Sequence, residues 1–462
     1  MKTDAHWEKV GMRPHHGICL PLFSLKMEQD SGSGEFLDLI PVIAWCRKAG
    51  FDCLQLLPLN DTGGDPSPYN PISSCALDPV YLSLPHSGPP LPRRALKAKK
   101  LRLLRDEFPR AFPALSREPA YTSFLEKSPW LSEYCRYMAM KEPGAGEDFY
   151  RYVQYLAFSQ LSEVKKAAEA HGIQLVGDLP LCLSPDSADV VSNPGLFRKD
   201  LVAGAPPDKY NALGQKWGFP LYDWDAMRKD RFRWWKRRLS ALSPFYHLYR
   251  IDHVVGFFRI WAIEEGKKPS EGHFIPSDPA VWANHGQALL EMMIESSPLL
   301  PIAEDLGTIP PEVYPILKAL GIPGTKILRW EMDTPLDSYE PLSLTTVSTA
   351  DMEPLPLWWR EYPEEAAAFA ASRGWEYEPS LSGERQIDIL SDAHHTSSLF
   401  HINLLQEYLF PFPELSRQSI EEERINIPGT LLPGNWAYRF RPSFEEIAAH
   451  EKLLAAIRKI IS

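Results

Sequence analysis

The segment His247–Arg259, HLYRIDHVVGFFR, contains the pattern that decides the fold: an apolar run with a charged residue, Asp252, at its end. Runs of this kind recur along the chain and are bounded by turn residues. Continuous apolar runs are typical of parallel strands that are covered on both faces. The predicted strands are Gly17–Leu25, Asp52–Leu59, Ile173–Leu181, His247–Val254, Leu299–Leu306, Gly324–Trp330, Leu344–Asp351 and Phe400–Leu405.

Segments with helical periodicity lie between most of these runs. Eight strands that alternate with helices predict an α/β fold, a (β/α)8 TIM barrel, with a doubly wound sheet as the competing architecture. The predicted helices are Phe36–Ala49, Tyr152–His171, Asp225–Leu242, Val281–Ile294, Pro311–Leu320, Glu364–Ser372, Glu384–His394 and Phe444–Ile461.

The gap between the second and third predicted strands is too long for one crossover helix. We therefore expect a single catalytic barrel over residues 1–462 that carries an inserted, mostly helical subdomain at residues 85–150. The insertion contains a Lys/Arg cluster, Arg93–Arg105, which we interpret as a solvated helix face; a nucleic-acid surface is the alternative.

Composition excludes several classes of protein. The 462 residues are 44% hydrophobic and 24% charged, which allows a large core, and the formal net charge is −11. Such a surface repels nucleic acid and anionic membranes. No run approaches the ~18 apolar residues of a membrane span, and the amino terminus does not resemble a secretory signal. We expect no nucleic-acid or membrane partner, and the sequence does not determine the oligomeric state.

The cysteines and histidines indicate no metal centre. The six cysteines form no CxxC pair, which predicts a reduced, cytoplasmic protein. The adjacent pairs His15-His16 and His394-His395 do not face one site on a helix, so we interpret them as surface or core residues. We expect neither a metal nor another cofactor.

Acidic residues stand at the ends of several predicted strands. A barrel enzyme carries its chemistry at the carboxyl ends of its strands. Any one carboxylate could instead cap a helix or anchor a loop through an ion pair, but a set on separate strands can converge on one pocket. These residues are Asp178, Asp252, Glu304, Asp305 and Asp351.

Several carboxylates without a nucleotide-binding loop favour glycoside chemistry. Cleavage of an acetal needs an acid for the leaving oxygen and a carboxylate that attacks the anomeric carbon. Arg250 lies two residues before Asp252, so both face the same side of a strand, and the guanidinium would keep Asp252 ionised. Glu304 follows Pro301, Ile302 and Ala303, an apolar setting compatible with a retained proton.

Aromatic residues on or beside the predicted loops are compatible with sugar binding. The apolar faces of sugar rings stack on aromatic side chains, although core or loop packing is the commoner explanation for any one of these residues. They are Tyr69, Tyr210, Trp217, Tyr222, Trp224 and Trp261.

Ordered motifs over nearly the whole chain resemble the 4-α-glucanotransferases known as amylomaltases or disproportionating enzymes, glycoside hydrolase family 77 of the α-amylase superfamily. The similar segments are SPYNPISSCALDP (67–79), GDLPLCLSPDSADVVSNPGLF (177–197), GAPPDKYNALGQKWGFPLYDW (204–224), RIDHVVGFFR (250–259), AEDLG (303–307), LGIPGTKILRW (320–330) and RINIPGTLLPGNWAYR (424–439).

The resemblance implies residue roles. Asp252 corresponds to the family's nucleophile, Glu304 to its general acid/base, and Asp351 to the aspartate that holds hydroxyls of the reacting glucose. Arg250 matches the arginine beside the nucleophile. The implied reaction is retaining transfer of α-1,4-glucan segments between malto-oligosaccharides or chains derived from glycogen or starch, with the two carboxyls ~5–5.5 Å apart. The residues matching the glucan groove are Ser67, Tyr69 and Trp217.

The sequence departs from the family pattern at three positions. Ala350 stands where the family carries a histidine that contacts the reacting sugar, and Lys209 and Ala212 replace a common aromatic and a common acidic residue. The candidates to replace the missing histidine are His253, His394 and His395. An α-glucan hydrolase and a weakly active or non-catalytic glucan-binding protein therefore remain as alternatives.

Overall fold

The strands of a computed structural model of the chain form a parallel barrel. The structure describes residues 1–86, 88–207 and 212–462. The sheet has eight strands in the order β10-β11-β12-β1-β2-β3-β6-β9. The predicted TIM barrel is thereby confirmed, and each predicted strand overlaps one of the observed strands, although β1 and β11 begin before their predicted ranges. These are β1 (His15–Leu20), β2 (Cys53–Leu56), β3 (Gln174–Leu179), β6 (Leu248–Ile251), β9 (Leu300–Ala303), β10 (Gly324–Ile327), β11 (Ser343–Thr346) and β12 (Phe400–Leu404).

The barrel closes where β9 meets β10, a contact that we call the seam. The Ala303 amide donates to the Pro323 carbonyl at 2.7 Å, and the Thr325 hydroxyl donates to the Ala303 carbonyl at 2.8 Å. Asp305 completes the seam because its Oδ1 accepts a hydrogen bond from the Thr325 amide at 2.6 Å. Asp305, one of the strand-end carboxylates, thus has a structural partner at the seam.

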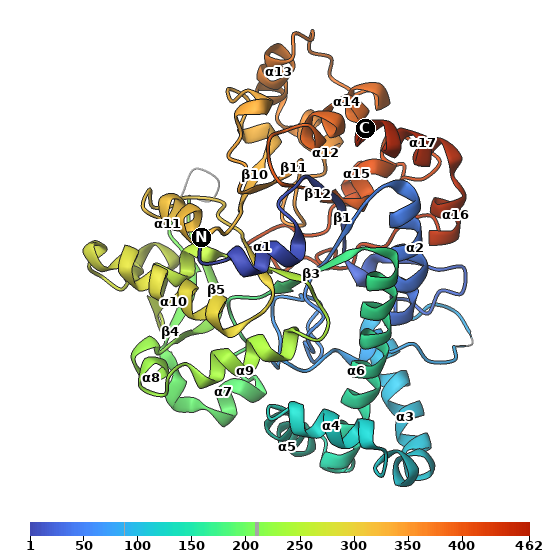
Figure 1. Cartoon of the computed structure of the whole chain (residues 1–462), viewed down its shortest axis with the longest axis vertical. Helices are drawn as coiled ribbons and strands as arrows, with labels where there is room; N and C mark the ends of the chain where they lie inside the picture. Colours follow the sequence, from blue (N-terminus) through green and yellow to red (C-terminus); the bar gives the residue numbers. More distant parts are fainter. Residues whose placement is uncertain (87, 208–211) are drawn as a thin grey trace.

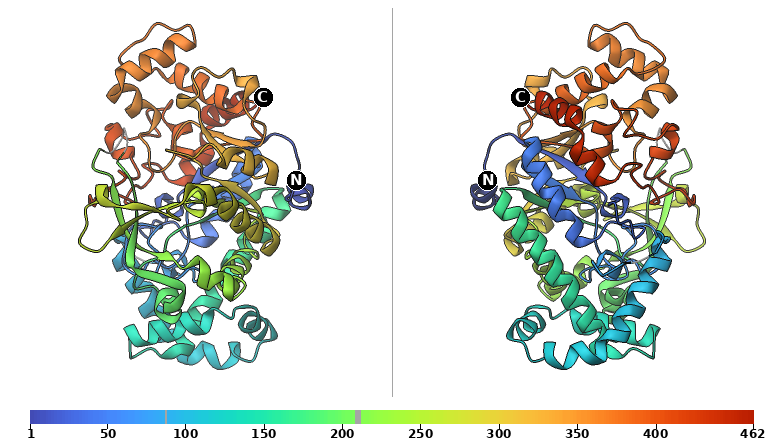
Figure 2. Two further views of the ribbon diagram at one scale, coloured as in Figure 1. Left: turned by 90° about the vertical axis from the view of Figure 1, so that its left-hand side faces the viewer. Right: turned by 90° about the vertical axis from the view of Figure 1, so that its right-hand side faces the viewer.

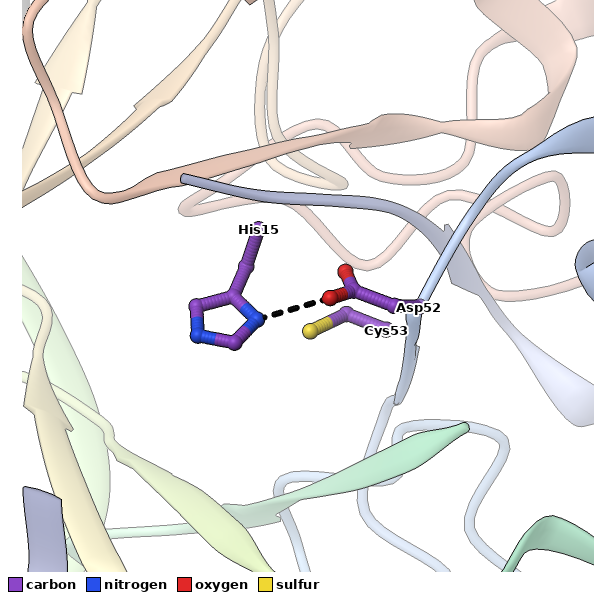
Figure 3. Close-up of side chains that lie close together, drawn as sticks. All are labelled: His15, Asp52 and Cys53. Carbon is purple, nitrogen blue, oxygen red and sulfur yellow. Dashed lines mark hydrogen bonds and ion pairs between the residues drawn. The ribbon is translucent and has the colours of Figure 1, made fainter. Parts of the chain in front are cut away.

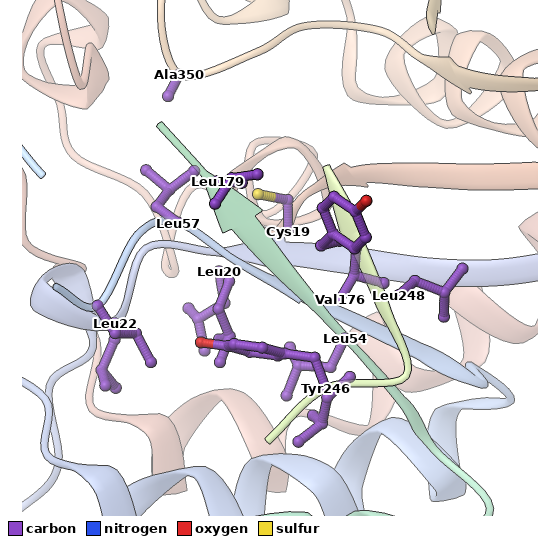
Figure 4. Packing of buried hydrophobic residues seen from close by; sticks show 14 of the residues in the cluster. Cys19, Leu20, Leu22, Leu54, Leu57, Val176, Leu179, Tyr246, Leu248 and Ala350 are labelled. Carbon is purple, nitrogen blue, oxygen red and sulfur yellow. The ribbon is translucent and has the colours of Figure 1, made fainter. Parts of the chain in front are cut away.

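The short strands are buried because helices cover the outside of the barrel and apolar side chains pack around the strands (Figures 1 and 4). Their burial on both faces explains the continuous apolar runs in the sequence. The helices outside the insertion are α1 (Asp4–Val10), α2 (Leu39–Ala49), α7 (Ala188–Ser192), α8 (Trp224–Lys229), α9 (Arg233–Leu242), α10 (Trp282–Ser296), α11 (Val313–Leu320), α12 (Leu355–Glu361), α13 (Pro363–Ser372), α14 (Gly383–His394), α15 (Leu405–Leu409), α16 (Phe444–Ala449) and α17 (Glu451–Ile460).

Two predicted helices are each divided into two. The helix predicted over Asp225–Leu242 is α8 followed by α9, and the break falls at Arg231 and Phe232, which both have left-handed backbone angles. The helix predicted over Phe444–Ile461 is α16 followed by α17, with His450 between them. The side chain of His450 accepts a hydrogen bond from the Leu453 amide at 3.0 Å and so caps α17.

A helical insertion between β2 and β3 lies at one end of the molecule (Figure 1). The last of its helices continues without a break into the barrel, so the expected boundary at residue 150 falls inside a helix. The insertion comprises α3 (Arg93–Leu115), α4 (Pro119–Lys127), α5 (Leu131–Lys141) and α6 (Gly146–His171).

The interpretation of the basic cluster as a solvated helix face is wrong for two of its lysines. Lys97 and Lys100 on α3 are buried. Lys97 forms ion pairs with Asp61 and Asp78, and Lys100 forms one with Glu35 at 2.6 Å. We call these five residues the anchor network. The cationic side chains are buried because acidic partners from the connections that follow β1 and β2 meet them there.

A second, antiparallel sheet lies outside the barrel, and sequence analysis missed it. Its order is β5-β4-β7-β8. Figure 2 shows this sheet on the side of the molecule opposite the two chain ends. Within the motif 204–224, Trp217 and Tyr222 were placed on or beside predicted loops, yet both belong to β5 of this sheet. The strands are β4 (Phe197–Ala205), β5 (Gln215–Tyr222), β7 (Ile260–Glu264) and β8 (His273–Ile275).

Two further features bear on the expectations from composition. Within the described part of the chain, every helix is too short or too polar to cross a membrane. All six cysteines lie within the described residues and carry free thiols.

Candidate active site

The three carboxylates expected to carry the chemistry come from three different strands. Asp252 follows β6, Glu304 follows β9, and Asp351 lies in the connection after β11. Glu304 and Asp351 line one cavity at the carboxyl ends of the strands, together with Arg250 and Tyr69. Asp252 joins them through an ion pair with Arg250 at 3.2 Å. The fold therefore brings these residues together, as the strand-end pattern indicates.

Arg250 is the centre of the charge arrangement. Its Nη1 donates to both oxygens of Asp178 at 2.9 Å and to Asp252 Oδ1 at 3.2 Å, while its Nη2 lies 3.6 Å from Glu304 Oε2. Burial alone would lower the pKa of Arg250, but the neighbouring carboxylates, Asp178 first and then Asp252, raise it well above its usual value. Arg250 thus stays cationic and holds the carboxylates around it.

Asp178 was recognised in the sequence as a strand-end carboxylate but was not assigned a role. Asp178 lies on β3, and its side chain is fully buried. It pairs with Arg250 on the neighbouring strand β6, with which it is in register. It also accepts a hydrogen bond from the Tyr69 hydroxyl at 2.7 Å. Burial raises the pKa of Asp178 to about 6, although Arg250 opposes the shift. Asp178 orients Arg250 and Tyr69 beneath Asp252.

Glu304 has the environment of a carboxylic acid that keeps its proton near neutral pH. Burial raises its pKa to about 8, the negative charge of Asp252 adds to the shift, and Arg250 opposes it. The carboxyl group is oriented by the backbone amide of His253, which donates to Oε2 at 2.7 Å, and by the Leu306 amide at 3.3 Å from Oε1. Asp252 accepts a hydrogen bond from the Leu181 amide at 3.3 Å.

Asp351 is held from a distant part of the chain. Its Oδ1 accepts a hydrogen bond from Asn426 Nδ2 at 2.6 Å. Although Asp351 keeps much of its surface open to solvent, the protein that encloses the cleft raises the pKa of its carboxyl. Asn426 was quoted within a motif but not recognised as a site residue, because nothing local distinguishes an asparagine that contacts a carboxylate 75 residues away.

The expected groove residues approach the site in different ways. Tyr69 lines the cavity and receives a hydrogen bond from Arg250 at 3.4 Å. Ser67 fixes the conformation of the same loop, because its hydroxyl accepts from the Tyr69 amide at 3.2 Å. Trp217 lies on β5, and its ring centroid is 5.1 Å from that of His253, beside Asp252. The second sheet thus carries Trp217 to the edge of the site.

Three of the other aromatic residues pack within the protein, and one lies outside the residues that the structure describes. Tyr222 and Trp224 pack against Trp235, and the indole N–H of Trp261 donates to the Pro269 carbonyl at 2.8 Å. These three contacts fit the packing interpretation. Tyr210 and Lys209 lie outside the described residues. Ala212 is exposed.

Two of the three histidines considered as replacements at Ala350 lie elsewhere. His394 is buried, and its Nδ1 is 2.8 Å from that of His16 at the amino end of β1, opposite to the carboxylates. His395 Nδ1 is bound to the Ser391 carbonyl at 2.7 Å on α14. Only His253 is at the site, through its backbone amide and its ring contact with Trp217. Ala350 itself lines the cavity.

His15, Asp52 and Cys53 form a separate group whose potential metal-ligating atoms lie within 4.8 Å of one another (Figure 3). Protein contacts already occupy the ligand atoms of His15: Nδ1 binds Asp52 at 2.8 Å and Nε2 binds the Gly11 carbonyl at 2.8 Å. The Arg13 guanidinium lies 2.7 Å from Asp52 and would repel a cation. We interpret the group as a structural contact at the amino end of the barrel.

The arrangement around Arg250 suits an acid-assisted displacement at an acetal carbon. Glu304 supplies a proton, Asp252 supplies a carboxylate held by a guanidinium and a backbone amide, and Asp351 presents a further carboxylate to the cavity. Two carboxyl groups with opposed environments and a third one beside them are what glycoside chemistry requires.

Comparisons with known proteins agree with this chemistry. The model of one protein family, described as 4-alpha-glucanotransferase of glycoside hydrolase family 77, matches residues 20–148 and 144–445. A 4-alpha-glucanotransferase of Chlamydia caviae is 42% identical over 99% of this chain and 96% of its own length. One from Chlamydia pneumoniae is 40% identical over 99% and 98%.

A solved structure supports the fold independently. The amylomaltase from Streptococcus agalactiae in complex with acarbose aligns over 97% of this chain and 99% of its own, with a TM-score of 0.83 and 23% identity. This likeness shows the fold, whereas the family assignment rests on the match to the family model and on the chlamydial relatives. The chain belongs to the 4-alpha-glucanotransferase family, glycoside hydrolase family 77.

Proposed function

We propose that this 4-alpha-glucanotransferase moves α-1,4-glucan segments between malto-oligosaccharides by a retaining double displacement in which Asp252 is the nucleophile. The family membership supports the reaction, and near-complete coverage of the chlamydial relatives supports its extension to this chain. The single observation that carries the mechanism is the contrast between two neighbouring carboxyl groups. Burial raises the pKa of Glu304 to about 8, whereas Asp252 accepts hydrogen bonds from the Arg250 guanidinium and the Leu181 amide.

In the first step Asp252 attacks the anomeric carbon while Glu304 protonates the leaving oligosaccharide. Formation of the glycosyl ester removes the negative charge of Asp252, which is one of the causes that raise the pKa of Glu304. The pKa of Glu304 therefore falls in the intermediate. The resulting carboxylate then acts as the base that deprotonates an incoming sugar 4-hydroxyl.

We assign supporting roles to the residues around this pair. Asp351, fixed by Asn426, accepts hydrogen bonds from hydroxyls of the reacting glucose. Arg250 orients Asp252. Tyr69 in the cavity wall and Trp217 beside His253 offer ring surfaces to the sugar, and Ser67 holds the Tyr69 loop. The donors are malto-oligosaccharides or glucans derived from glycogen or starch.

Product analysis on maltotriose tests the proposal. Disproportionation yields glucose together with oligosaccharides longer than maltotriose, whereas an α-glucan hydrolase yields only shorter products. Asp252→Asn should lower kcat at least about a thousandfold because it removes the nucleophile. Glucan binding without turnover by the wild type would instead favour a non-catalytic binding protein, and unchanged activity in Asp252→Asn would refute the assigned nucleophile.

A further inference from the structure

Gln55 is a buried polar residue in the wall of the catalytic cavity, and its side chain has no hydrogen-bond partner among the described residues. It lies on β2, is 8% exposed, and lines the same cavity as Glu304 and Asp351. Within residues 1–86, 88–207 and 212–462, no group forms a hydrogen bond with its amide. Because Gln55 lines the cavity, the donor and the acceptor of its amide are open to a ligand there.

The surroundings of Gln55 are apolar. Its neighbours in register are Cys19 on β1 and Val176 on β3, and both line the cavity with it. Leu57, two residues further along the chain from Gln55, lines the cavity as well. Figure 4 shows Cys19, Leu57 and Val176 among the apolar side chains packed around the barrel strands. The amide of Gln55 is thus the hydrogen-bonding group of its row, and in an apolar wall such a group interacts strongly with a ligand.

Two other residues of the cavity lining do not compete with this amide for a ligand. Ala350 contributes only a methyl group to the lining beside Asp351. Asp178, which lies two residues beyond Val176 on β3, is already committed to Arg250 and Tyr69. Among the described residues of this lining, Gln55 thus presents a side-chain amide that is free to bind a ligand.

We propose that Gln55 is a substrate-binding residue whose side-chain amide forms a hydrogen bond with a hydroxyl of the glucose unit that reacts between Asp252 and Glu304. This inference rests on the proposed function. An amide both donates and accepts, so it can bind either the oxygen or the hydrogen of a sugar hydroxyl. A site that hydrogen-bonds a substrate hydroxyl also discriminates strongly against sugars that lack it.

A second buried glutamine provides a matched control. Gln154 on α6 is 2% exposed. Its Nε2 donates to the Leu77 carbonyl at 2.8 Å, and its Oε1 accepts from the Leu77 amide at 2.9 Å. The two glutamines therefore differ in the property at issue: the amide of Gln154 is paired within the protein, whereas that of Gln55 faces the catalytic cavity.

The same substitution at both positions tests the inference. Gln55→Leu should lower kcat/KM for maltotriose roughly 10-fold and leave Tm unchanged or higher, because it removes an unpaired buried group. Gln154→Leu should lower Tm and leave kcat/KM within about twofold of the wild type. If Gln55→Leu leaves kcat/KM unchanged, or lowers Tm as Gln154→Leu does, the inference is wrong.

Modified donors identify the hydroxyl and separate this inference from the proposed function. With maltotriose analogues that each lack one hydroxyl of the reacting glucose, the wild type and Gln55→Leu should react equally with the analogue that lacks the bound hydroxyl. If kcat/KM of Gln55→Leu is lower than that of the wild type by the same factor with every analogue, Gln55 does not contact a hydroxyl of the reacting glucose. A wild type that does not disproportionate maltotriose would refute the proposed function, whereas an active wild type matched by Gln55→Leu would refute this inference alone.

Discussion

Glu304 and Asp305 are adjacent carboxylates with different environments. Glu304 faces the cavity, and the backbone amide of His253 orients it there. Asp305 is buried, and its Oδ1 accepts from the Thr325 amide at the seam. The sequence AEDLG predicts that acidic groups stand at the end of this strand. It does not distinguish the carboxyl that faces the pocket from the one that joins two strands, because that depends on where β10 lies.

The pKa of Glu304 predicts an alkaline limit to catalysis. Glu304 must be protonated in the first step, and its pKa is raised to about 8, so kcat/KM for maltotriose should fall as the pH rises above about 8. A pH profile of kcat/KM between 5 and 10 measures this limit. With a glycosyl fluoride donor, whose leaving group needs no proton, the decline should disappear; a decline of equal size with that donor would contradict the assignment of Glu304 as the acid.

At the scale of the elements, the insertion helix α3 is attached to the loop that carries Tyr69. Besides its two ion pairs, Lys97 donates to the Gly63 carbonyl at 2.9 Å, and Arg93 donates to the Pro66 carbonyl at 3.0 Å. Both carbonyls precede Tyr69 in the connection after β2. The positively charged segment was interpreted as solvated because its acidic partners, Asp61 and Asp78, lie outside α3 in the sequence. The anchor network therefore links the insertion to the catalytic pocket.

Removal of the Lys97 ammonium group should lower the stability of the protein. Lys97→Met leaves Asp61 and Asp78 buried without this partner and should lower the free energy of unfolding by about 3–5 kcal/mol, as measured by chemical denaturation. We also expect a higher KM for maltotriose, because the Tyr69 loop loses its support. Arg94→Met on the exposed side of α3 is the control and should change the stability by less than about 0.5 kcal/mol. Equal stability of the two variants would contradict a role for the anchor network.

At the scale of the whole molecule, two kinds of buried titratable groups make the free energy of unfolding depend on pH in opposite directions. The pKa is raised to about 8 in Glu304, to about 7 in Glu407 and to about 6 in Asp178, in each case chiefly by burial. Burial lowers the pKa of His16 and His247 to about 4. The folded protein therefore holds carboxyl protons that the unfolded chain releases, and excludes histidine protons that the unfolded chain takes up.

These shifts predict two opposite pH dependences of the free energy of unfolding, one from the carboxyls and one from the histidines. The carboxyls lower the free energy of unfolding as the pH rises from about 4.5 towards 8, and the histidines lower it as the pH falls from about 6.5 towards 4. Chemical denaturation across this range measures both slopes. Glu304→Gln removes one raised carboxyl and should flatten the decline above pH 6.5. Identical slopes in the wild type and Glu304→Gln would show that Glu304 does not carry a raised pKa.

The barrel, the helical insertion and the set of strand-end acids could be predicted from the sequence. Buried parallel strands leave continuous apolar runs in the chain, and a charged residue at the end of such a run is visible locally. Tertiary structure alone decided which charges are paired: the burial of Lys97 and Lys100, the contact of Asn426 with Asp351, and the unpartnered amide of Gln55. The second sheet also became visible only in the fold. The physical reason is that pairing and desolvation depend on groups that are distant in sequence and meet only after the barrel has closed.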